Sequence, residues 1–166
     1  KLTQEAGSTS KSRSAKEAKD FEALYNSARH ISSEGWDGIH AASFRNAAIS
    51  ACRACGFKMT HAKLALFVEA DGFDSDDKTP LVRITRGEPE MVISPCRNAT
   101  GVIDLRPRPT YFPWFASLRI RFDAGMLTQE DVVNLMARVG MQVGIGEGRP
   151  DSKASAGLGN GLFQIL

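Results

Sequence analysis

The stretch VGIGEGRPDSKASAGLGNGLFQI, residues 143–165, is the part of the chain on which the predicted fold depends most. It joins the last expected helix to the last expected strand and holds six of the chain's 15 glycines, with Arg149 and Lys153 between them. Glycine tolerates positive φ and lets bare backbone approach a ligand or another chain. Exposed N–H groups beside cations suit an anionic polymer. We interpret the stretch as a contact loop; the alternative is a surface loop without a partner.

The composition is that of one ordinary globular domain. A chain of 166 residues with 42% hydrophobic content can bury its own core. No apolar run approaches the ~18 residues of a membrane span, so no membrane partner is expected. Three cysteines, an odd number, do not make a disulfide framework, which favours a reducing cytoplasm. Residues 1–14 are polar and expected to be flexible, and residues 15–166 form the domain.

Positive charge is concentrated in the middle of the chain. The formal net charge is only +2, but the segment from Arg97 to Arg121 holds five arginines and a single acid, Asp104. A basic centre of this kind favours binding of a polyanion. The alternative is the solvated outer face of a strand pair, and charge alone does not separate the two.

Three helices are expected from capping residues and apolar periodicity. The first begins at Ser14 and runs to about residue 30. The second covers about 41–55 and is stopped by Gly56. The third is capped by Thr128 with Asp131 and is ended by Gly140.

Alternating apolar residues between turn signals predict strands after the second helix. The first two strands are joined across an acidic loop, and the fourth and fifth pair with each other in antiparallel fashion. Prolines at 107, 109 and 113 remove ladder donors and exclude a central strand between the fourth and fifth. The expected strands are 64–70, 80–86, 90–94, 101–106, 116–123 and 162–165. The order of elements predicts an α+β two-layer sandwich with a mainly antiparallel sheet.

The cysteines offer one possible metal site. Cys52 and Cys55 form a CxxC pair, which His61 and Cys96 could complete as a tetrahedral zinc site. Both cysteines of the pair fall on or near the apolar face of the second helix, where small residues pack. We therefore favour packing over zinc.

The remaining polar residues form no active-site pattern in the sequence. The histidines at 30, 40 and 61 are interpreted as ordinary surface or cap residues, and the acidic loop 71–77 as a solvated hairpin connection. No nucleophile elbow or P-loop is present, so we expect no enzyme, no cofactor and no metal. A metal-dependent nuclease would instead need a carboxylate cluster such as Asp104, Glu147 and Asp151.

Arginines interleaved with aromatic residues form the most promising binding surface. Guanidinium groups hold phosphates, and exposed aromatic faces stack on unpaired bases. For Trp114, core packing is the favoured alternative, and the two arginines of the second helix are weaker candidates. The expected nucleic-acid-binding residues are Arg106, Arg108, Arg119, Arg121, Arg149, Lys153, Gly144, Gly146, Gly148, Gly157, Gly159, Tyr111, Trp114, Arg45 and Arg53.

Two motifs resemble hallmarks of the RAMP superfamily, the RNA-binding backbone proteins of CRISPR effector complexes. They are GIHAASFRNA at residues 38–47 and the terminal GIGEGRP with GLGNGLF. The chain is also similar, from about residue 15 to 165, to small uncharacterised proteins of tailed bacteriophages and prophages. The similarity lies in the order of four motifs: DGI-A-F, RPR…W, LRIRF and GIGEGRP…G…F. The resemblance implies an RRM-like or ferredoxin-like core with helices on one face and a first strand before residue 1.

The resemblance also implies side-by-side assembly along a single-stranded nucleic acid. We therefore expect a phage-type protein that binds single-stranded DNA or RNA in the cytoplasm of a bacterial host, as a homo-oligomer or filament. The alternative is a protein-interaction or assembly module that binds no nucleic acid.

Overall fold

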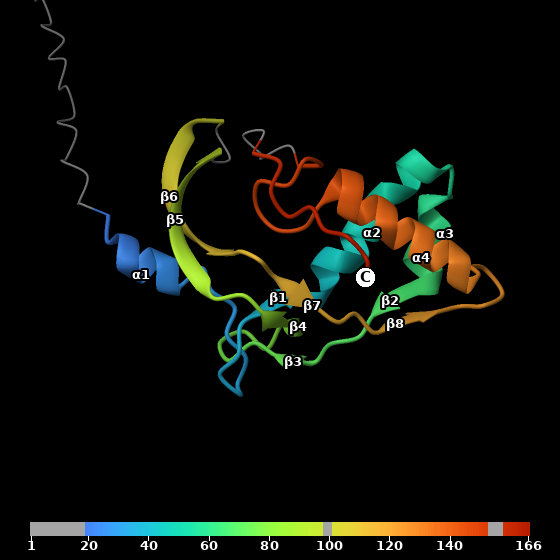
Figure 1. Cartoon of the computed structure of the whole chain (residues 1–166), viewed down its shortest axis with the longest axis horizontal. Helices are drawn as coiled ribbons and strands as arrows, with labels where there is room; N and C mark the ends of the chain where they lie inside the picture. Colours follow the sequence, from blue (N-terminus) through green and yellow to red (C-terminus); the bar gives the residue numbers. More distant parts are fainter. Residues whose placement is uncertain (1–18, 98–100, 153–157) are drawn as a thin grey trace, which may run out of the picture.

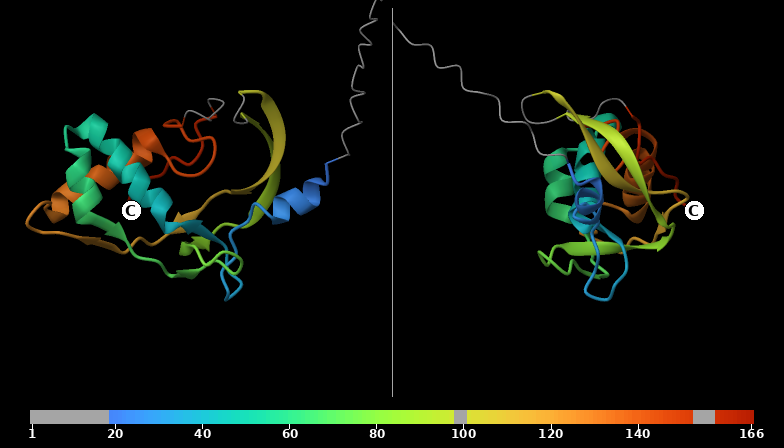
Figure 2. Two further views of the ribbon diagram at one scale, coloured as in Figure 1. Left: turned by 180° about the vertical axis from the view of Figure 1, so that it is seen from behind. Right: turned by 90° about the vertical axis from the view of Figure 1, so that its left-hand side faces the viewer.

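The computed structural model describes residues 19–97, 101–152 and 158–166 (Figure 1). Three helices lie on one side of short antiparallel strands, and a long curved two-stranded ribbon stands apart from them. The segment after the last helix, coloured red, lies between the ribbon and the helices in both Figure 1 and Figure 2. The chain is therefore an α+β protein with antiparallel sheets, as predicted. Segment 1–14, predicted to be flexible, the predicted helix cap Ser14, and the predicted binding residues Lys153 and Gly157 lie outside the described residues.

The central sheet is built around strand β4, Pro80–Arg86. Strands β1, Gly38–His40, and β3, Gly72–Phe73, pair with β4 in the order β1-β4-β3, and β7, Phe115–Ala116, also pairs with β4. Every pairing is antiparallel. The bounds of β4 are those predicted from its alternating sequence.

Two further antiparallel pairs complete the described strands. Strand β2, Leu66–Val68, pairs with β8, Ile120–Phe122. Strand β5, Pro89–Arg97, pairs over its whole length with β6, Ile103–Tyr111, to form the curved ribbon. The strands thus form three separate groups, so a single RRM-like sheet stays a prediction.

The helices follow local capping signals. Helix α2, Ala41–Cys55, ends at Gly56, whose φ of 72° is the left-handed conformation that glycine allows. Helix α4, Gln129–Arg138, begins with a reciprocal capping box between Thr128 and Asp131. These predictions are confirmed.

The main core lies between α2, α4 and the inner face of the strands. Phe44 and Cys52 of α2 and Leu135 of α4 are 1% exposed, so each is fully packed. Leu66 of β2 and Val82 of β4 close the core from the sheet side. The spacing of the apolar residues on α2 and α4 places them on the faces that meet.

The first helix is shorter than expected. Within the described residues, α1 covers Phe21–Asn26 and begins at Asp20, whose carboxylate accepts the N–H groups of the first turn. The chain leaves the helix before residue 30 because the backbone around His30 pairs with Gly38 instead.

The strand predicted for 64–70 begins two residues later in the structure, at Leu66. Helix α3, Met59–Ala65, occupies its first residues and packs Ala62 and Ala65 into the core. Strand β2 then pairs with β8, whereas β3 forms the hairpin with β4 across the acidic loop. Tertiary packing of two alanines on α2 decides between helix and strand here.

The pairing predicted for 101–106 is wrong. Residues 103–106 begin β6, which continues to Tyr111 and pairs with β5, while segment 116–123 holds the end of β7 and the whole of β8. Pro107 and Pro109 lie inside β6 at alternate positions, so their missing N–H groups face the same side. A two-stranded ribbon has an outer edge without ladder bonds, and proline is compatible with that edge.

The chain beyond α4 also differs from the prediction. Gly140 does not end the helix, because a π-helical turn, Val139–Val143, continues it to Gly144. Residues 162–165 form no strand; instead, Phe163 N donates to Gly140 O at 3.0 Å. A Cβ at Gly140 would lie 2.2 Å from the Phe163 oxygen, so this glycine permits close packing of the terminal segment.

The close approach of Gly161 to Ile145 gives a test of how the terminal segment is held. Gly161 and Gly146 both have positive φ, near 75°. A Cβ at Gly161 would lie 1.8 Å from the Ile145 oxygen, whereas Gly146 has open space. We expect Gly146→Ala to cost about 1–2 kcal/mol of backbone strain. Gly161→Ala should lower the free energy of unfolding by about 1–3 kcal/mol more than Gly146→Ala does, because its Cβ clashes with Ile145. Denaturant unfolding measures both losses, and equal losses in the two variants would contradict this packing.

Candidate functional site

Residues 144–161 are here called the glycine loop, and the described residues at its two ends are hydrogen-bonded to each other. Ile145 N donates to Gly161 O and Asn160 N donates to Gly148 O, both at 3.0 Å. The glycines at 144, 146, 148, 159 and 161 all have φ between 69° and 79°, a backbone conformation that residues other than glycine rarely adopt. The glycines are therefore needed for the shape of the loop as well as for any contact it makes.

Two arginines hold the glycine loop against the rest of the molecule. Arg108 of β6 pairs with Glu147, and Arg53 of α2 binds both carboxylate oxygens of Asp151 at 2.7 and 2.6 Å. Arg108 was predicted to hold phosphate, and Arg53 was a weaker candidate for contact with nucleic acid. In the structure they neutralise the loop's own carboxylates and fix its position between the ribbon and α2.

Glu147 is hydrogen-bonded to Arg108 and Cys96 of the ribbon. Burial would raise the pKa of its carboxyl, but hydrogen bonds from Arg108 and the Cys96 thiol, with the positive charges of Arg108 and Arg106, hold the pKa below its ordinary value of 4.5. The Cys96 thiol has a raised pKa, chiefly because of burial. Glu147 is therefore ionised at neutral pH and remains paired with the ribbon.

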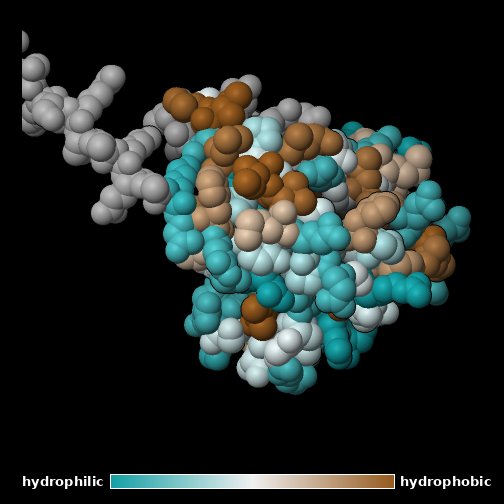
Figure 3. Space-filling model, turned by 60° about the vertical axis from the view of Figure 1, so that its left-hand side comes forward, coloured by the Kyte–Doolittle hydropathy of each residue, from teal (hydrophilic) through white to brown (hydrophobic). Residues whose placement is uncertain are grey.

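A cleft of about 1650 Å³ lies between the ribbon, the start of α2 and the glycine loop. Arg108 and Glu147 line it as a neutral pair, and His30 and His40 lie on another part of its wall. Many of the other lining residues are aromatic or aliphatic. The aromatic ones are Phe44, Tyr111, Phe112, Trp114, Phe115 and Phe163. Figure 3, in which the left-hand side of Figure 1 is brought forward, shows apolar side chains gathered on the upper part of that face.

The aromatic residues of the cleft differ in how far their rings are buried and in what they contact. Trp114 packs edge-on against Phe163 at 5.9 Å between ring centroids, which confirms core packing. The Tyr111 hydroxyl donates to Asp37, which Arg29 also holds, and burial raises the pKa of that hydroxyl. Phe112 is 89% exposed, so it is the ring available to a ligand.

A smaller pocket of about 370 Å³ lies between α2 and the glycine loop. Ser43, Asn46 and Ser50 project from one side of α2, because spacings of three and four residues share a helix face. Arg149 and the backbone of residues 145–148 close the other side. The pocket and the large cleft share Ser43 and residues 145–148 as walls.

The other predicted arginines lie elsewhere. Arg106 pairs with Asp104, and Arg119 pairs with Asp71 at 3.0 Å. Arg45 and Arg121 both stack on the exposed Phe67 ring, at 5.0 and 5.6 Å from its centroid. Arg45, Arg119 and Arg121 line neither the cleft nor the pocket. The predicted site therefore divides into a part at the glycine loop and a part on the β2–β8 pair.

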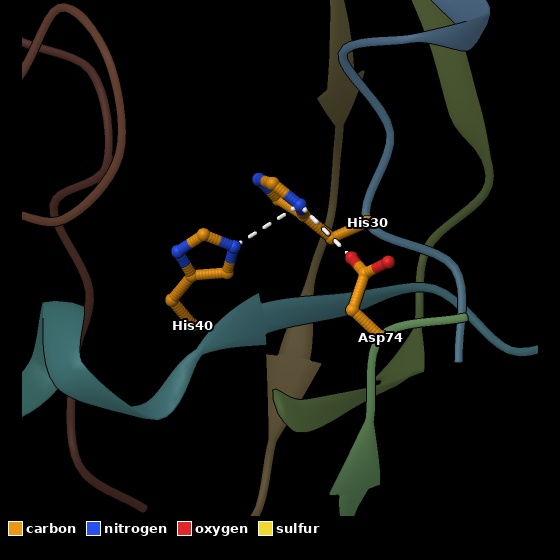
Figure 4. Close-up of side chains that lie close together, drawn as sticks. All are labelled: His30, His40 and Asp74. Carbon is orange, nitrogen blue, oxygen red and sulfur yellow. Dashed lines mark hydrogen bonds and ion pairs between the residues drawn. The ribbon is translucent and has the colours of Figure 1, made fainter. Parts of the chain in front are cut away.

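One group of residues was missed by the sequence analysis. His30, His40 and the buried Asp74 come together beside the cleft (Figure 4). Burial and the neighbouring His30 lower the pKa of His40. Their spacing of 10 and 34 residues matches no local ligand motif, so sequence gave no signal for the group.

The cysteines do not assemble into a metal site among the described residues. Cys52 is buried in the core and donates to Ala48 O at 3.4 Å, which confirms the packing interpretation. Cys96 lies on the ribbon beside Glu147. In the part of the chain that the structure describes, the metal-competent group is His30 with His40 and Asp74.

No family model, curated protein sequence or solved structure matches the chain significantly. Across the described residues, no helix combines the length and apolar character needed to cross a membrane.

The lowered pKa of Glu147 predicts a pH-dependent contribution to stability. A depressed carboxyl pKa stabilises the fold above the unfolded-state pKa, and this contribution is lost as pH falls through the folded-state pKa. We expect the stability advantage of the wild type over Glu147→Gln to be constant above about pH 5 and to shrink in more acidic solution. Denaturant unfolding at a series of pH values measures it. Glu90→Gln, an exposed carboxylate on the same ribbon, is the matched control, and identical pH profiles for the two variants would contradict the assignment.

Proposed function

We propose that the chain binds single-stranded nucleic acid across the glycine loop. The sugar-phosphate backbone would occupy the polar pocket beside α2, and the bases would enter the aromatic cleft. The observation that carries the proposal is the shared wall of the two hollows at Ser43 and residues 145–148. A nucleic-acid strand has the same division, with a charged polar edge next to flat apolar bases.

The pocket has the chemistry of a phosphate site. The Ser43 and Ser50 hydroxyls and the Asn46 amide supply neutral donors. Arg149 uses one nitrogen on Gly146 O at 3.0 Å, and its guanidinium carries further N–H donors. Gly146 and Gly148, both with positive φ, also line the pocket, and without side chains they let a ligand approach the backbone beside Arg149.

The cleft has the chemistry of a base-stacking site. Phe112 exposes its ring at the cleft, and stacking on a ring is tolerant of base identity. The charges of Arg108 and Glu147 cancel, so the cleft attracts phosphate weakly. Its apolar walls suit the faces of unpaired bases better than they suit phosphate groups. Duplex DNA and RNA keep their bases stacked inside, so the proposal favours single strands.

An RRM-like arrangement related to RAMP proteins is part of the same proposal. Its support is the position of the glycine loop against α2 and the antiparallel sheet on which α2 packs. A phage-type role in a bacterial cytoplasm follows from that resemblance.

Binding of labelled single strands tests the proposed function. We expect Phe112→Ala to cost about 1–3 kcal/mol of affinity, the usual cost of removing one stacking ring. Arg149→Ala should weaken binding and reduce the salt slope by about 0.7, the value for one phosphate on a single strand. Fluorescence anisotropy with single-stranded and duplex DNA and RNA at two salt concentrations measures both effects.

Arg138→Ala is the matched control, since Arg138 is exposed at the end of α4, away from both hollows. Equal losses in Arg138→Ala and Arg149→Ala, or affinity for duplexes equal to that for single strands, would contradict the proposal.

A second candidate function, assembly of copies of this chain, is favoured by the outer face of the ribbon. The register places four large apolar residues on one face, opposite the side that carries Arg108 and Cys96 toward the glycine loop. These residues are Met91, Ile93, Ile103 and Leu105, and they are 44–56% exposed. Apolar side chains gathered on one face of a protruding ribbon suit contact with another subunit.

Oligomeric state without nucleic acid tests this second candidate. We expect the wild type to form concentration-dependent oligomers and the double variant Ile93→Asp with Leu105→Asp to remain monomeric, measured by light scattering after size exclusion. Val133→Asp on α4, at a residue 48% exposed, is the control and should assemble as the wild type does. A monomeric wild type across the concentration range would rule out this role.

A further inference from the structure

Three potential metal ligands meet near the start of α2. His30 precedes β1, His40 ends β1 and caps α2, and Asp74 directly follows β3. His30 Nδ1 lies 3.2 Å from Asp74 Oδ2 and 3.1 Å from His40 Nε2, and all three ligand atoms lie within 4.8 Å of one another. Figure 4 shows the two imidazoles and the carboxylate converging from three separate segments.

A proton alone does not satisfy this arrangement. If His30 Nδ1 carries a hydrogen directed at Asp74, it cannot also make a linear hydrogen bond with His40 Nε2. If His40 Nε2 donates to His30 Nδ1, the lone pair of His30 is used and Asp74 Oδ2 faces it without a hydrogen. A cation between the three atoms would use one lone pair from each.

We propose that His30, His40 and Asp74 bind a divalent metal ion of the zinc type. Two imidazoles and one carboxylate are a ligand set that zinc accepts, with bonds of about 2.0–2.2 Å. In a tetrahedral site such bonds separate the ligand atoms by about 3.3 Å. The observed 3.1 and 3.2 Å separations are close to this value, and the third pair of ligand atoms, on His40 and Asp74, lies within 4.8 Å.

The backbone around the ligands holds them in place before any ion binds. Gly38 N donates to His30 O at 2.9 Å, and Ser32 forms a bridge with Asp74. The second oxygen of Asp74 accepts Asp76 N at 2.9 Å, which leaves Oδ2 directed at the histidine. The Asp74 side chain is only 6% exposed, and a buried carboxylate requires a compensating partner. Outer hydrogen bonds of this kind orient metal ligands.

The site has one side open to the cleft. Both histidines line the cleft, whereas Asp74 lies behind them in the fold. Three protein ligands with an open fourth position are typical of zinc sites that also bind water or a ligand atom. The ion would therefore face the same cleft as the proposed base-binding surface, but its binding does not depend on nucleic acid.

Calorimetric titration of the full chain with zinc chloride, after chelation and dialysis, tests the site. We expect one ion per chain, with Asp74→Asn and His30→Ala each weakening affinity by more than about 100-fold, beyond the usual effect of an outer-shell change. Magnesium should give no binding, since it prefers oxygen ligands. Cobalt(II) should give the visible absorption of a low-coordinate site in the wild type but not in Asp74→Asn or His30→Ala.

His61→Ala is the matched control, because His61 is exposed on α3 away from the group, and it should bind zinc as the wild type does. Asp74→Asn keeps the side-chain shape, and circular dichroism without metal shows whether each variant is folded. Zinc binding that persists in folded Asp74→Asn and His30→Ala would assign the ion to other groups, such as the cysteines, and overturn the proposal. Absence of any zinc binding by the wild type would do the same.

Discussion

The ion pair between Arg108 and Glu147 joins the curved ribbon to the glycine loop, and the cleft lies between these two elements. A two-stranded ribbon has little stability of its own, so contacts with the body of the protein decide where it stands. A second pair, Arg53 with Asp151, fixes the loop to α2 from the other side. The two arginines predicted to contact a partner are therefore paired with carboxylates of the glycine loop and hold the loop in place.

This use of charge changes what the surface can recognise. With its arginine neutralised, the cleft offers rings, aliphatic side chains and backbone rather than a row of free cations. The polar pocket next to it keeps Arg149 and three polar side chains of α2. Base contact therefore carries more of the proposed recognition than phosphate contact does.

Helix α2 contributes to the core, the smaller pocket, the anchoring of the glycine loop and the histidine group. Its apolar face fills the core, its polar stripe lines the smaller pocket, and Arg53 near its end holds the glycine loop. Its cap, His40, belongs to the histidine group beside the cleft. One rigid helix thus sets the relative positions of the loop and the proposed metal site.

The sequence alone determined the elements whose signals are local. These elements are helix 41–55 with its glycine stop, the capping box at Thr128 and strand 80–86. Their signals come from neighbouring residues, because capping, φ preference and alternation of apolar residues act over a few positions. Only the tertiary structure decided which strands pair, which carboxylate each arginine meets and that His30 meets Asp74. Those contacts join residues distant in the chain, and local preference carries no information about them.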